Sequence, residues 1–329
     1  MVDLAVKEDV PLLLSSARLS RSYRAERTFK NLTLACALFV AAMFVGIIWS
    51  LFDGAWPAIR AFGVGFLFTE AWNPVTERFG ALAPIYGTLM TSLIAMLTSV
   101  PIGIGIAIFL TELCPRGLRR PIGVAVELLA GIPSIIYGIW GLFVLAPILQ
   151  QGLMPFLIAT FDGVPLLSSL FAGPPYGIGI FTAGLILAIM TLPFVAAITR
   201  DVFETVPPVL KEAAYGLGAT VWEVQWNVVL PYARSGVVGG VMLALGRALG
   251  ETMAVTFVIG NAHRISSSLL APGTTISAAI ANEFTEAFGE LYTASLVELG
   301  LILFFVTFLV LAAAQYMLYQ LERRAGGRS

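Results

Sequence analysis

The chain has 329 residues, of which 58% are hydrophobic and 12% are charged, with a formal net charge of −1. A soluble domain carries about twice that share of charge, and a disordered chain carries fewer apolar residues, so both classes are excluded. Two cysteines are too few for a disulfide-rich fold. We therefore expect an all-α polytopic membrane protein.

The chain contains six stretches long and apolar enough to cross a bilayer as helices, which takes about 20 residues each. In chain order, we predict spans at residues 32–52, 84–110, 121–147, 177–199, 236–262 and 293–320. We expect Pro147 and the polar residues after it to end the third span. Residues 1–30 then form an N-terminal segment, and residues 31–325 form the membrane domain.

The positions of the basic residues predict the orientation. Most of the 19 lysines and arginines lie before the first span, in the second and fourth connections, and after the last span. Because basic segments stay on the cytoplasmic side, we expect both termini to be cytoplasmic. The loops at 53–83, 148–176 and 263–292 should face outside.

The fourth connection, residues 200–235, is longer than a tether needs to be and predicts two short helices. The first begins near Pro208, since proline suits a first helical turn. The second begins at Thr220 with Glu223 three residues later, a capping-box pattern. The first helix has an apolar face formed by Leu210, Ala213, Ala214 and Leu217. This face either packs on the chain's own helix ends or fits a groove on a cytoplasmic partner.

This connection resembles the EAA loop of ABC importer permeases. The residues that carry the resemblance, at the family's spacing, are Glu212, Ala213, Ala214, Gly218, Leu230 and Pro231. Val228 stands where the family has isoleucine. The resemblance implies that the loop docks onto a separate ATPase subunit. The sequence itself contains no G-x-x-x-x-G-K-[ST] loop, so we expect a transport subunit that is not an enzyme.

Three further segments, 127–143, 246–255 and 260–284, resemble the permeases of phosphate-specific ABC importers, in particular the PstC type. The resemblance implies a type I ABC importer permease in the bacterial cytoplasmic (inner) membrane. It also implies three kinds of partner: a PstA-like permease, two PstB-like ATPase subunits and a PstS-like phosphate-binding protein. No cofactor and no nucleic-acid partner are expected. The alternatives within this class are a PstA-type subunit or a permease for another oxyanion.

Arg247 and Glu251 are charged residues within the fifth predicted span, where a charge costs about 2.5–3.5 kcal/mol. Four residues apart on a helix, they would share one face and partly neutralise each other. One interpretation is a salt bridge that fixes this span to a neighbour. The other is a pathway site, in which the guanidinium binds an anion and the carboxylate moderates its charge. The resemblance implies a role in phosphate passage.

Weaker candidates lie elsewhere in the chain. Three residues near the kink expected at Pro133 are candidates for lining a pathway: Ser134, Tyr137 and Glu127. Ser134 and Tyr137 offer hydroxyl groups, whereas for Glu127 a structural role is the favoured interpretation. The only histidine, His263, is expected at the outer membrane surface, and no metal site is expected. In the third outer loop, acidic residues are expected to help dock the binding protein: Glu283, Glu286 and Glu290.

Two functions of other classes remain as alternatives at this stage. An ion-coupled secondary transporter needs no ATPase, and therefore no exposed loop of the EAA kind. A membrane scaffold that transports nothing needs no charged residues at mid-membrane. The EAA-like loop argues against the transporter, and Arg247 with Glu251 argues against the scaffold.

Overall fold

The computed structural model describes residues 16–165 and 167–326, so half of the predicted segment 1–30 lies outside the described residues. Within these ranges the chain is helical, with an isolated antiparallel bridge between Asn73 and Arg78. The α-helices are α1 (Ser16–Phe62), α2 (Gly65–Phe68), α3 (Leu82–Ile108), α4 (Arg116–Ala130), α5 (Ser134–Trp140), α6 (Ala146–Ile148), α7 (Met154–Phe161), α8 (Leu167–Leu170), α9 (Ile180–Glu204), α10 (Pro208–Gly216), α11 (Val221–Val224), α12 (Leu230–Leu249), α13 (Met253–Thr256), α14 (Ile276–Glu283) and α15 (Glu290–Gly326). π-helical segments adjoin them at Phe109–Leu113, Gly141–Leu145, Leu149–Leu153 and Gln225–Val229.

The chain divides into two compact units, residues 1–53 and 54–329. In the first unit, the side chains of Leu38, Phe39 and Trp49 on α1 are 61%, 64% and 73% exposed. A helix that is apolar on all sides suits lipid better than water. This helix contains the first predicted span, 32–52.

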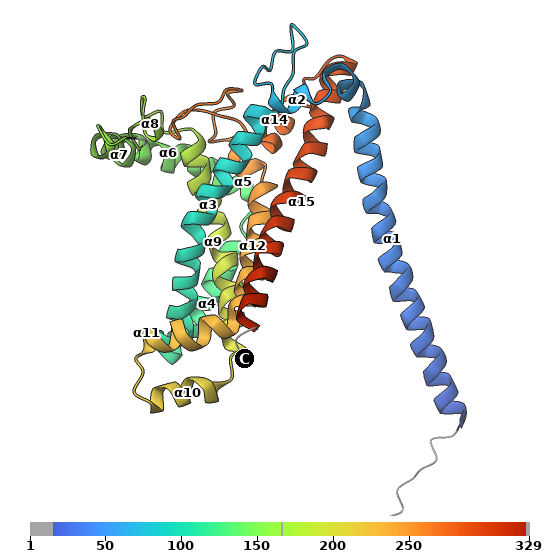
Figure 1. Ribbon diagram of the computed structural model, residues 1–329, viewed down its shortest axis with the longest axis vertical. Helices are drawn as coiled ribbons and strands as arrows, with labels where there is room; N and C mark the ends of the chain where they lie inside the picture. The colour runs from blue at the N-terminus through green and yellow to red at the C-terminus, as the bar shows by residue number, and fades with distance from the viewer. Residues whose placement is uncertain (1–15, 166, 327–329) are drawn as a thin grey trace, which may run out of the picture. The chain divides into compact units, whose positions relative to one another are not determined.

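The second unit is built around α3 and α9, which pack along each other, while α12 packs against both and α15 packs against α12 (Figure 1). Glycines bring these helices close together. A Cβ atom at Gly184 of α9 would lie 2.6 Å from the side chain of Ile94 on α3, and one at Gly240 of α12 would lie 2.6 Å from that of Ile198 on α9. Small residues favour such contacts in membranes, because helix association there depends on close packing.

The prediction of an all-α protein with six spans is confirmed. In the described part of the chain, the helices long and apolar enough to cross a membrane are Glu26–Phe62, Leu82–Leu113, Ser134–Phe161, Ile180–Glu204, Val221–Leu249 and Glu290–Gln320.

The third span differs from the predicted range of 121–147. α4 ends at Ala130, and the span begins at Ser134, because Pro133 lacks an N–H and disfavours helical geometry at Ile132. Pro147 does not end the span, and helical structure continues to Phe161. The π-helical segments on both sides of Pro147 shift the hydrogen-bond pattern and so accommodate the missing donor.

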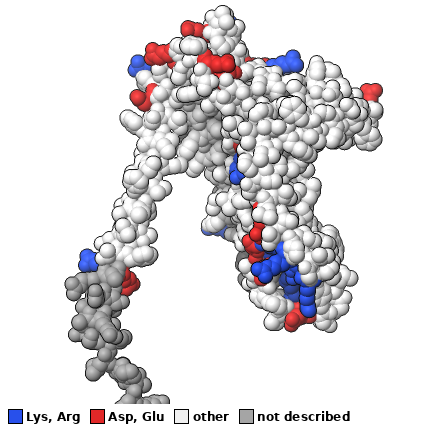
Figure 2. Space-filling model, turned by 180° about the vertical axis from the view of Figure 1, so that it is seen from behind, with Lys and Arg blue, Asp and Glu red and all other residues white. Residues whose placement is uncertain are grey.

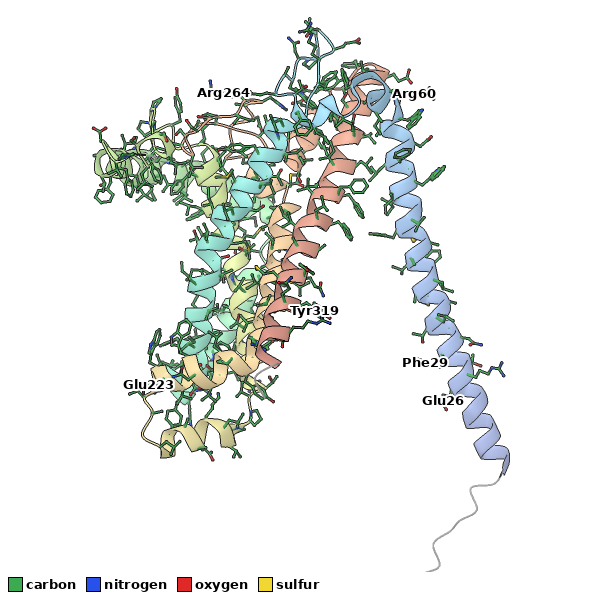
Figure 3. The ribbon with its side chains drawn as sticks, in the orientation of Figure 1. Glu26, Phe29, Arg60, Glu223, Arg264 and Tyr319 are labelled. Atoms are coloured by element: carbon green, nitrogen blue, oxygen red, sulfur yellow. The ribbon has the colours of Figure 1, made fainter. Side chains whose placement is uncertain are left out.

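The connections of the second unit gather at two opposite ends (Figure 1). We call the end that carries α10 and α11 the α10 end, and the end that carries α14 and the loop 257–275 the α14 end. Charged residues of this unit lie mainly at the two ends, with a largely uncharged zone between them (Figure 2). Glu223 lies at the α10 end and Arg264 at the α14 end (Figure 3).

Candidate functional site

The structure places a helix break beside Arg247. α12 ends at Leu249, and Gly250 follows with φ −92° and ψ 0°. Thr252, with φ −113° and ψ −68°, precedes the short helix α13. The carboxylate of Glu251 accepts a 3.3 Å hydrogen bond from the backbone N–H of Ala254, so it caps a free donor at the start of α13.

The fifth span therefore ends earlier than the predicted 236–262, and the prediction that Arg247 and Glu251 share one face of a helix is wrong. Glycine has a low helix propensity, and Gly250 is where the helix stops. Glu251 is half-buried, whereas Arg247 is exposed. Arg247 forms no ion pair with any residue whose side chain the structure describes, so its guanidinium is available to an anion.

A second helix break lies at residues 131–133, and α5, which follows it, packs against α13, which follows the first break. A Cβ atom at Gly138 of α5 would lie 3.0 Å from the carbonyl oxygen of Met253 in α13. The buried Tyr137 donates a 2.8 Å hydrogen bond to the carbonyl of Leu129, across the gap between α4 and α5. Tyr137 also lies within electrostatic range of Arg247. Ser134 lies half-buried at the start of the same short helix as Tyr137.

Glu127 belongs to a different environment. Its carboxylate lies 2.6 Å from Nη2 of Arg200, at the α10 end of α9. The ion pair joins α4 to α9, which agrees with the structural interpretation of Glu127. The predicted grouping of this residue with Ser134 and Tyr137 is not seen.

The loop 200–235 forms the expected pair of short helices, α10 and α11. The predicted capping box is present, because the Thr220 side chain accepts from the Glu223 N–H while the Glu223 carboxylate accepts from the Thr220 N–H. Gly218 separates the helices with φ +87°, a left-handed conformation that favours glycine. Leu230 and Pro231 begin α12.

The loop's apolar face packs in part on the chain's own helix ends, and the rest of it is exposed. Ala214 is half-buried against a cluster that includes Phe203 and Val206, so the loop packs on the chain's own helix ends. Glu212 and Ala213 are exposed, and Leu217 is 90% exposed. A leucine this exposed at the tip of a helix is available to another surface.

Lys211 anchors α10 in a way the sequence did not reveal. Its Nζ lies 2.7 Å from the carboxylate of Glu112, in the π-helical segment that continues α3, and both side chains are mostly buried. Burial and the nearby negative charge of Glu112 raise the pKa of Tyr215. The loop is therefore tied directly to the central helix α3.

Replacing Glu112 with alanine should loosen α10. A hydrogen bond to a charged group contributes about 1.5–3 kcal/mol, so amide hydrogen exchange in residues 208–216 should quicken by about ten- to a hundredfold. The matched control is Glu212→Ala, which removes an exposed carboxylate one residue from Lys211. The charge-swapped pair Glu112→Lys with Lys211→Glu should restore protection, and equal exchange in all variants would contradict the anchor.

At the α14 end, four side chains from distant parts of the chain form a compact cluster. Glu283 accepts hydrogen bonds of 2.6 Å from Trp72 Nε1 and Tyr292 Oη, and its other oxygen lies 2.7 Å from Nε2 of His263. The His263 ring stacks on Trp72, with 4.9 Å between the ring centroids. His263 is therefore half-buried, rather than a simple interfacial side chain. Trp72 and Tyr292 were missed because no short-range pattern links residues 72, 263, 283 and 292.

The cluster predicts a dependence on pH. Burial alone would raise the pKa of Glu283, but hydrogen bonds from His263, Tyr292 and Trp72 outweigh burial and lower the pKa below its ordinary value of 4.5. A carboxyl group whose pKa is lower in the folded state stabilises the fold above the unfolded pKa, and this stabilisation disappears as the pH falls through the folded value.

Glu283→Gln should therefore lower the free energy of unfolding by about 1–3 kcal/mol at pH 7, because it weakens three hydrogen bonds. The difference from the unaltered chain should shrink as the pH falls below 4.5. Thermal unfolding of both forms at matched pH measures this. Glu286→Gln, which alters an exposed carboxylate of the same loop, is the control. A difference that does not change with pH would contradict the assignment.

The chain is similar in sequence to a known protein family and to individual members of it. The profile of the family described as "Binding-protein-dependent transport system inner membrane component" matches residues 81–326. The chain is 66% identical over 324 residues to the phosphate transport system permease protein PstC of Mesorhizobium japonicum, covering 98% of this chain and 99% of that protein. It is 56% identical over 301 residues to the protein of the same name from Pasteurella multocida, covering 92% and 94%.

Solved structures show the same fold at low sequence identity. A chain of the bacterial alginate ABC transporter, in complex with an alginate pentasaccharide-bound periplasmic protein, matches with a TM-score of 0.58 and 17% identity, covering 89% of this chain and 96% of that one. A chain of the MetNI methionine ABC transporter in an inward-facing conformation matches with a TM-score of 0.52 and 18% identity, covering 72% and 94%. These likenesses concern the fold alone.

Proposed function

The chain belongs to the family of binding-protein-dependent transport system inner membrane components. From this membership and from the structure, we propose a function for the chain and roles for its residues in import. The chain is a multi-pass permease subunit of a phosphate ABC importer in the bacterial inner membrane. The observation that carries this conclusion is the 66% identity to a phosphate permease along nearly the whole length of both chains. As a transport subunit, the chain is not itself an enzyme.

The finer assembly is part of the proposal. A PstA-like permease pairs with this chain to form the pathway, two PstB-like subunits hydrolyse ATP, and a PstS-like protein delivers phosphate. The α10 end faces the cytoplasm, since the basic residues of the sequence favour that side. Both termini are then cytoplasmic. The α14 end receives the binding protein, with Glu286 and Glu290 as exposed acidic contacts.

Within the pathway, Arg247 is the proposed anion contact. The exposed Arg247 lies near the end of α12, just before the non-helical residues 250–252. Non-helical backbone at membrane depth is tolerated where it lines a cavity or is buried in protein. Tyr137 and Ser134 line the same region, and Glu251 holds the break in shape by capping α13. Binding must be weak enough to release phosphate, which suits a site with a single arginine.

The loop 200–235 is the proposed contact with the ATPase. Its exposed surface includes Leu217, and its ion pair with Glu112 links α10 to α3. ATP-driven closure of the ATPase pair would move α10, and α3 would carry that movement to α9, along which it packs.

Reconstitution tests the function directly. The chain is co-expressed with the three partner subunits, purified and inserted into proteoliposomes with the binding protein outside. Uptake of radiolabelled phosphate should require both ATP and the binding protein. ATP-independent uptake by this chain alone, driven by an ion gradient, would overturn the proposal.

A further inference from the structure

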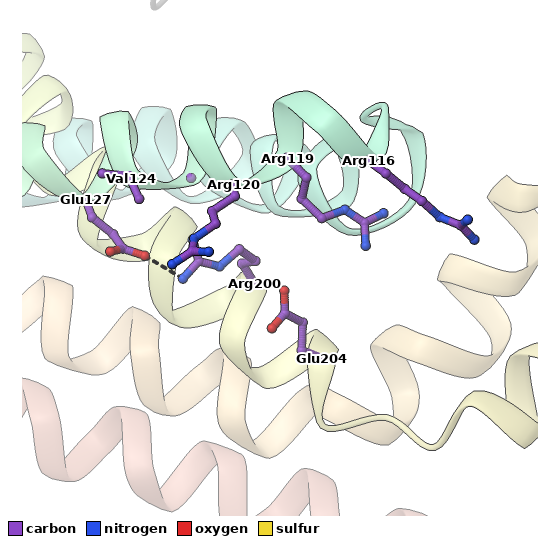
Figure 4. A pocket seen from close by; sticks show the side chains of 8 residues that line it. Arg116, Arg119, Arg120, Val124, Glu127, Arg200 and Glu204 are labelled. Atoms are coloured by element: carbon purple, nitrogen blue, oxygen red, sulfur yellow. Dashed lines mark hydrogen bonds and ion pairs between the residues drawn. The ribbon is translucent and has the colours of Figure 1, made fainter.

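A cavity of about 360 Å³ opens at the α10 end, between α4 and the end of α9 (Figure 4). Four arginines line it, three from α4 and one from α9. Figure 4 shows the Arg120 side chain extending toward Arg200 at the end of α9, while Arg119 and Arg116 extend to the right of it. The charged residues that line this arginine pocket are Arg116, Arg119, Arg120, Glu127, Arg200 and Glu204.

The positions of the arginines that line this pocket are unfavourable for the stability of α4. Arg116, Arg119 and Arg120 stand at positions i, i+3 and i+4, so they project from one side of α4. They occupy the start of the helix, where the helix dipole favours acidic residues, and the first turn of α4 holds none. Gly123 leaves room for the fourth arginine, since a Cβ atom there would lie 2.8 Å from Nη1 of Arg200.

The carboxylates around the pocket do not balance its arginines. Arg200 is the well-neutralised member, with Glu127 at 2.6 Å and Asp201 at 2.7 Å. Arg119 donates to the carbonyl of Thr111 through Nη2, while its buried Nε has no hydrogen-bond partner.

Arg116 and Arg120 form no ion pair with any residue whose side chain is described. The lining holds four arginines and two glutamates, Glu127 and Glu204, and Asp201 beside it pairs with Arg200, so positive charge exceeds negative charge by one. Uncompensated guanidinium groups that share one cavity repel each other, and an anion between them would remove that repulsion.

We propose that the arginine pocket binds a phosphate group, with Arg116 and Arg120 as its principal contacts. Guanidinium donors match phosphate oxygens in a bidentate geometry, and an anionic phosphate group would neutralise the excess positive charge. The start of α4 adds backbone N–H groups that favour an anion. Two sources offer this group: free phosphate on the cytoplasmic side and the headgroup of an anionic phospholipid.

The arginine pocket is separate from Arg247, because it lies between α4 and α9. Phosphate binding in the pocket can be measured without transport. It adds a phosphate-binding site at the α10 end to the pathway contact already proposed. If phosphate leaves the permease past α4, the pocket would hold it near the exit. If a lipid fills it, the headgroup would fasten α4 to α9 at the membrane surface.

The experiment compares the unaltered permease–ATPase complex with a variant carrying Arg116→Gln and Arg120→Gln. Both substitutions affect exposed side chains without described ion-pair partners, so the fold should be retained. The matched control carries Arg78→Gln and Arg264→Gln, which remove two exposed arginines from the opposite end. A third variant, Arg116→Lys with Arg120→Lys, keeps the charge but loses the bidentate geometry.

One arm measures binding of radiolabelled orthophosphate, without ATP or binding protein, in nanodiscs of phosphatidylcholine alone. The other measures by mass spectrometry how much phosphatidylglycerol and cardiolipin stay with the complex purified from native membranes. For free phosphate, the glutamine variant should weaken orthophosphate binding by about tenfold or more, and the lysine variant should weaken it less.

For a lipid headgroup, the glutamine variant should lose the acidic lipids while orthophosphate binding stays unchanged. Weaker orthophosphate binding, loss of acidic lipid, or both in the glutamine variant would support the arginine pocket as a phosphate-binding site. The proposal is overturned if the glutamine variant matches the Arg78/Arg264 control in both arms. Since neither arm requires transport, failure here is distinct from failure of the proposed import function.

Discussion

Replacing Arg247 with glutamine is expected to lower phosphate uptake at subsaturating phosphate by about ten- to a hundredfold. A hydrogen bond to a charged group contributes about 1.5–3 kcal/mol, and glutamine keeps the side chain's hydrogen-bonding character but not its charge. The side chain is exposed and without a described ion pair, so the substitution should leave the fold and the assembly intact. Uptake into proteoliposomes, with co-purification of the partner subunits, measures both parts.

Two further variants separate charge from geometry. Arg247→Lys keeps the positive charge and should retain part of the uptake, because lysine cannot bind phosphate in a bidentate geometry. Glu251→Gln keeps an oxygen that can cap Ala254, so the helix break should persist while the negative charge is lost. Normal uptake by Arg247→Gln would remove this residue from the pathway.

Replacing Gly218 with aspartate is expected to abolish ATP-driven transport by weakening contact with the ATPase. Nothing lies within 4 Å of a Cβ atom at Gly218, so the new side chain would point away from this chain. At a protein interface it would bury an unpaired charge, a penalty of about 2–5 kcal/mol. Co-purification of the ATPase and phosphate-dependent ATP hydrolysis measure the effect.

The control is Gly218→Asn, because asparagine has the same shape as aspartate and both tolerate the left-handed backbone better than most residues. At φ +87°, both variants carry similar backbone strain and differ in charge. We expect the asparagine variant to keep most of its ATPase binding. Equal loss in both variants would indicate strain in the turn, and unchanged transport in Gly218→Asp would refute the contact.

Local signals predicted local structure well. Composition was enough for the number of spans, because the free energy of inserting a helix depends mainly on its apolar length. The start of α10 at Pro208 and the capping box of Thr220 and Glu223 depend on neighbouring residues only, and both are present. The same reasoning placed the break at Pro133 as a kink, but it did not separate α4 from the third span.

The contacts that shape the sites were beyond sequence reasoning. Glu112 with Lys211 and Glu127 with Arg200 join residues 99 and 73 positions apart, and periodicity carries no information at such distances. The break after Leu249 was missed because apolar residues resume at Met253, so residues 236–262 were interpreted as one span despite Arg247, Gly250 and Glu251. The function of Arg247 stays a prediction, since the structure supplies its environment and not its ligand.

The close fit of α3, α9 and α12 restricts how the permease can move. Side chains of Ile94 and Ile198 sit against glycines on the facing helices, so sliding one helix along another would drive larger residues into the same space. Shear between these helices is therefore unfavourable, and hinge motion is the alternative. The segments able to act as hinges are the non-helical residues 131–133 and 250–252. Opening and closing of the permease would then bend the backbone next to Arg247. The conformational change that opens the pathway to one side of the membrane would therefore also change the affinity of Arg247 for the anion.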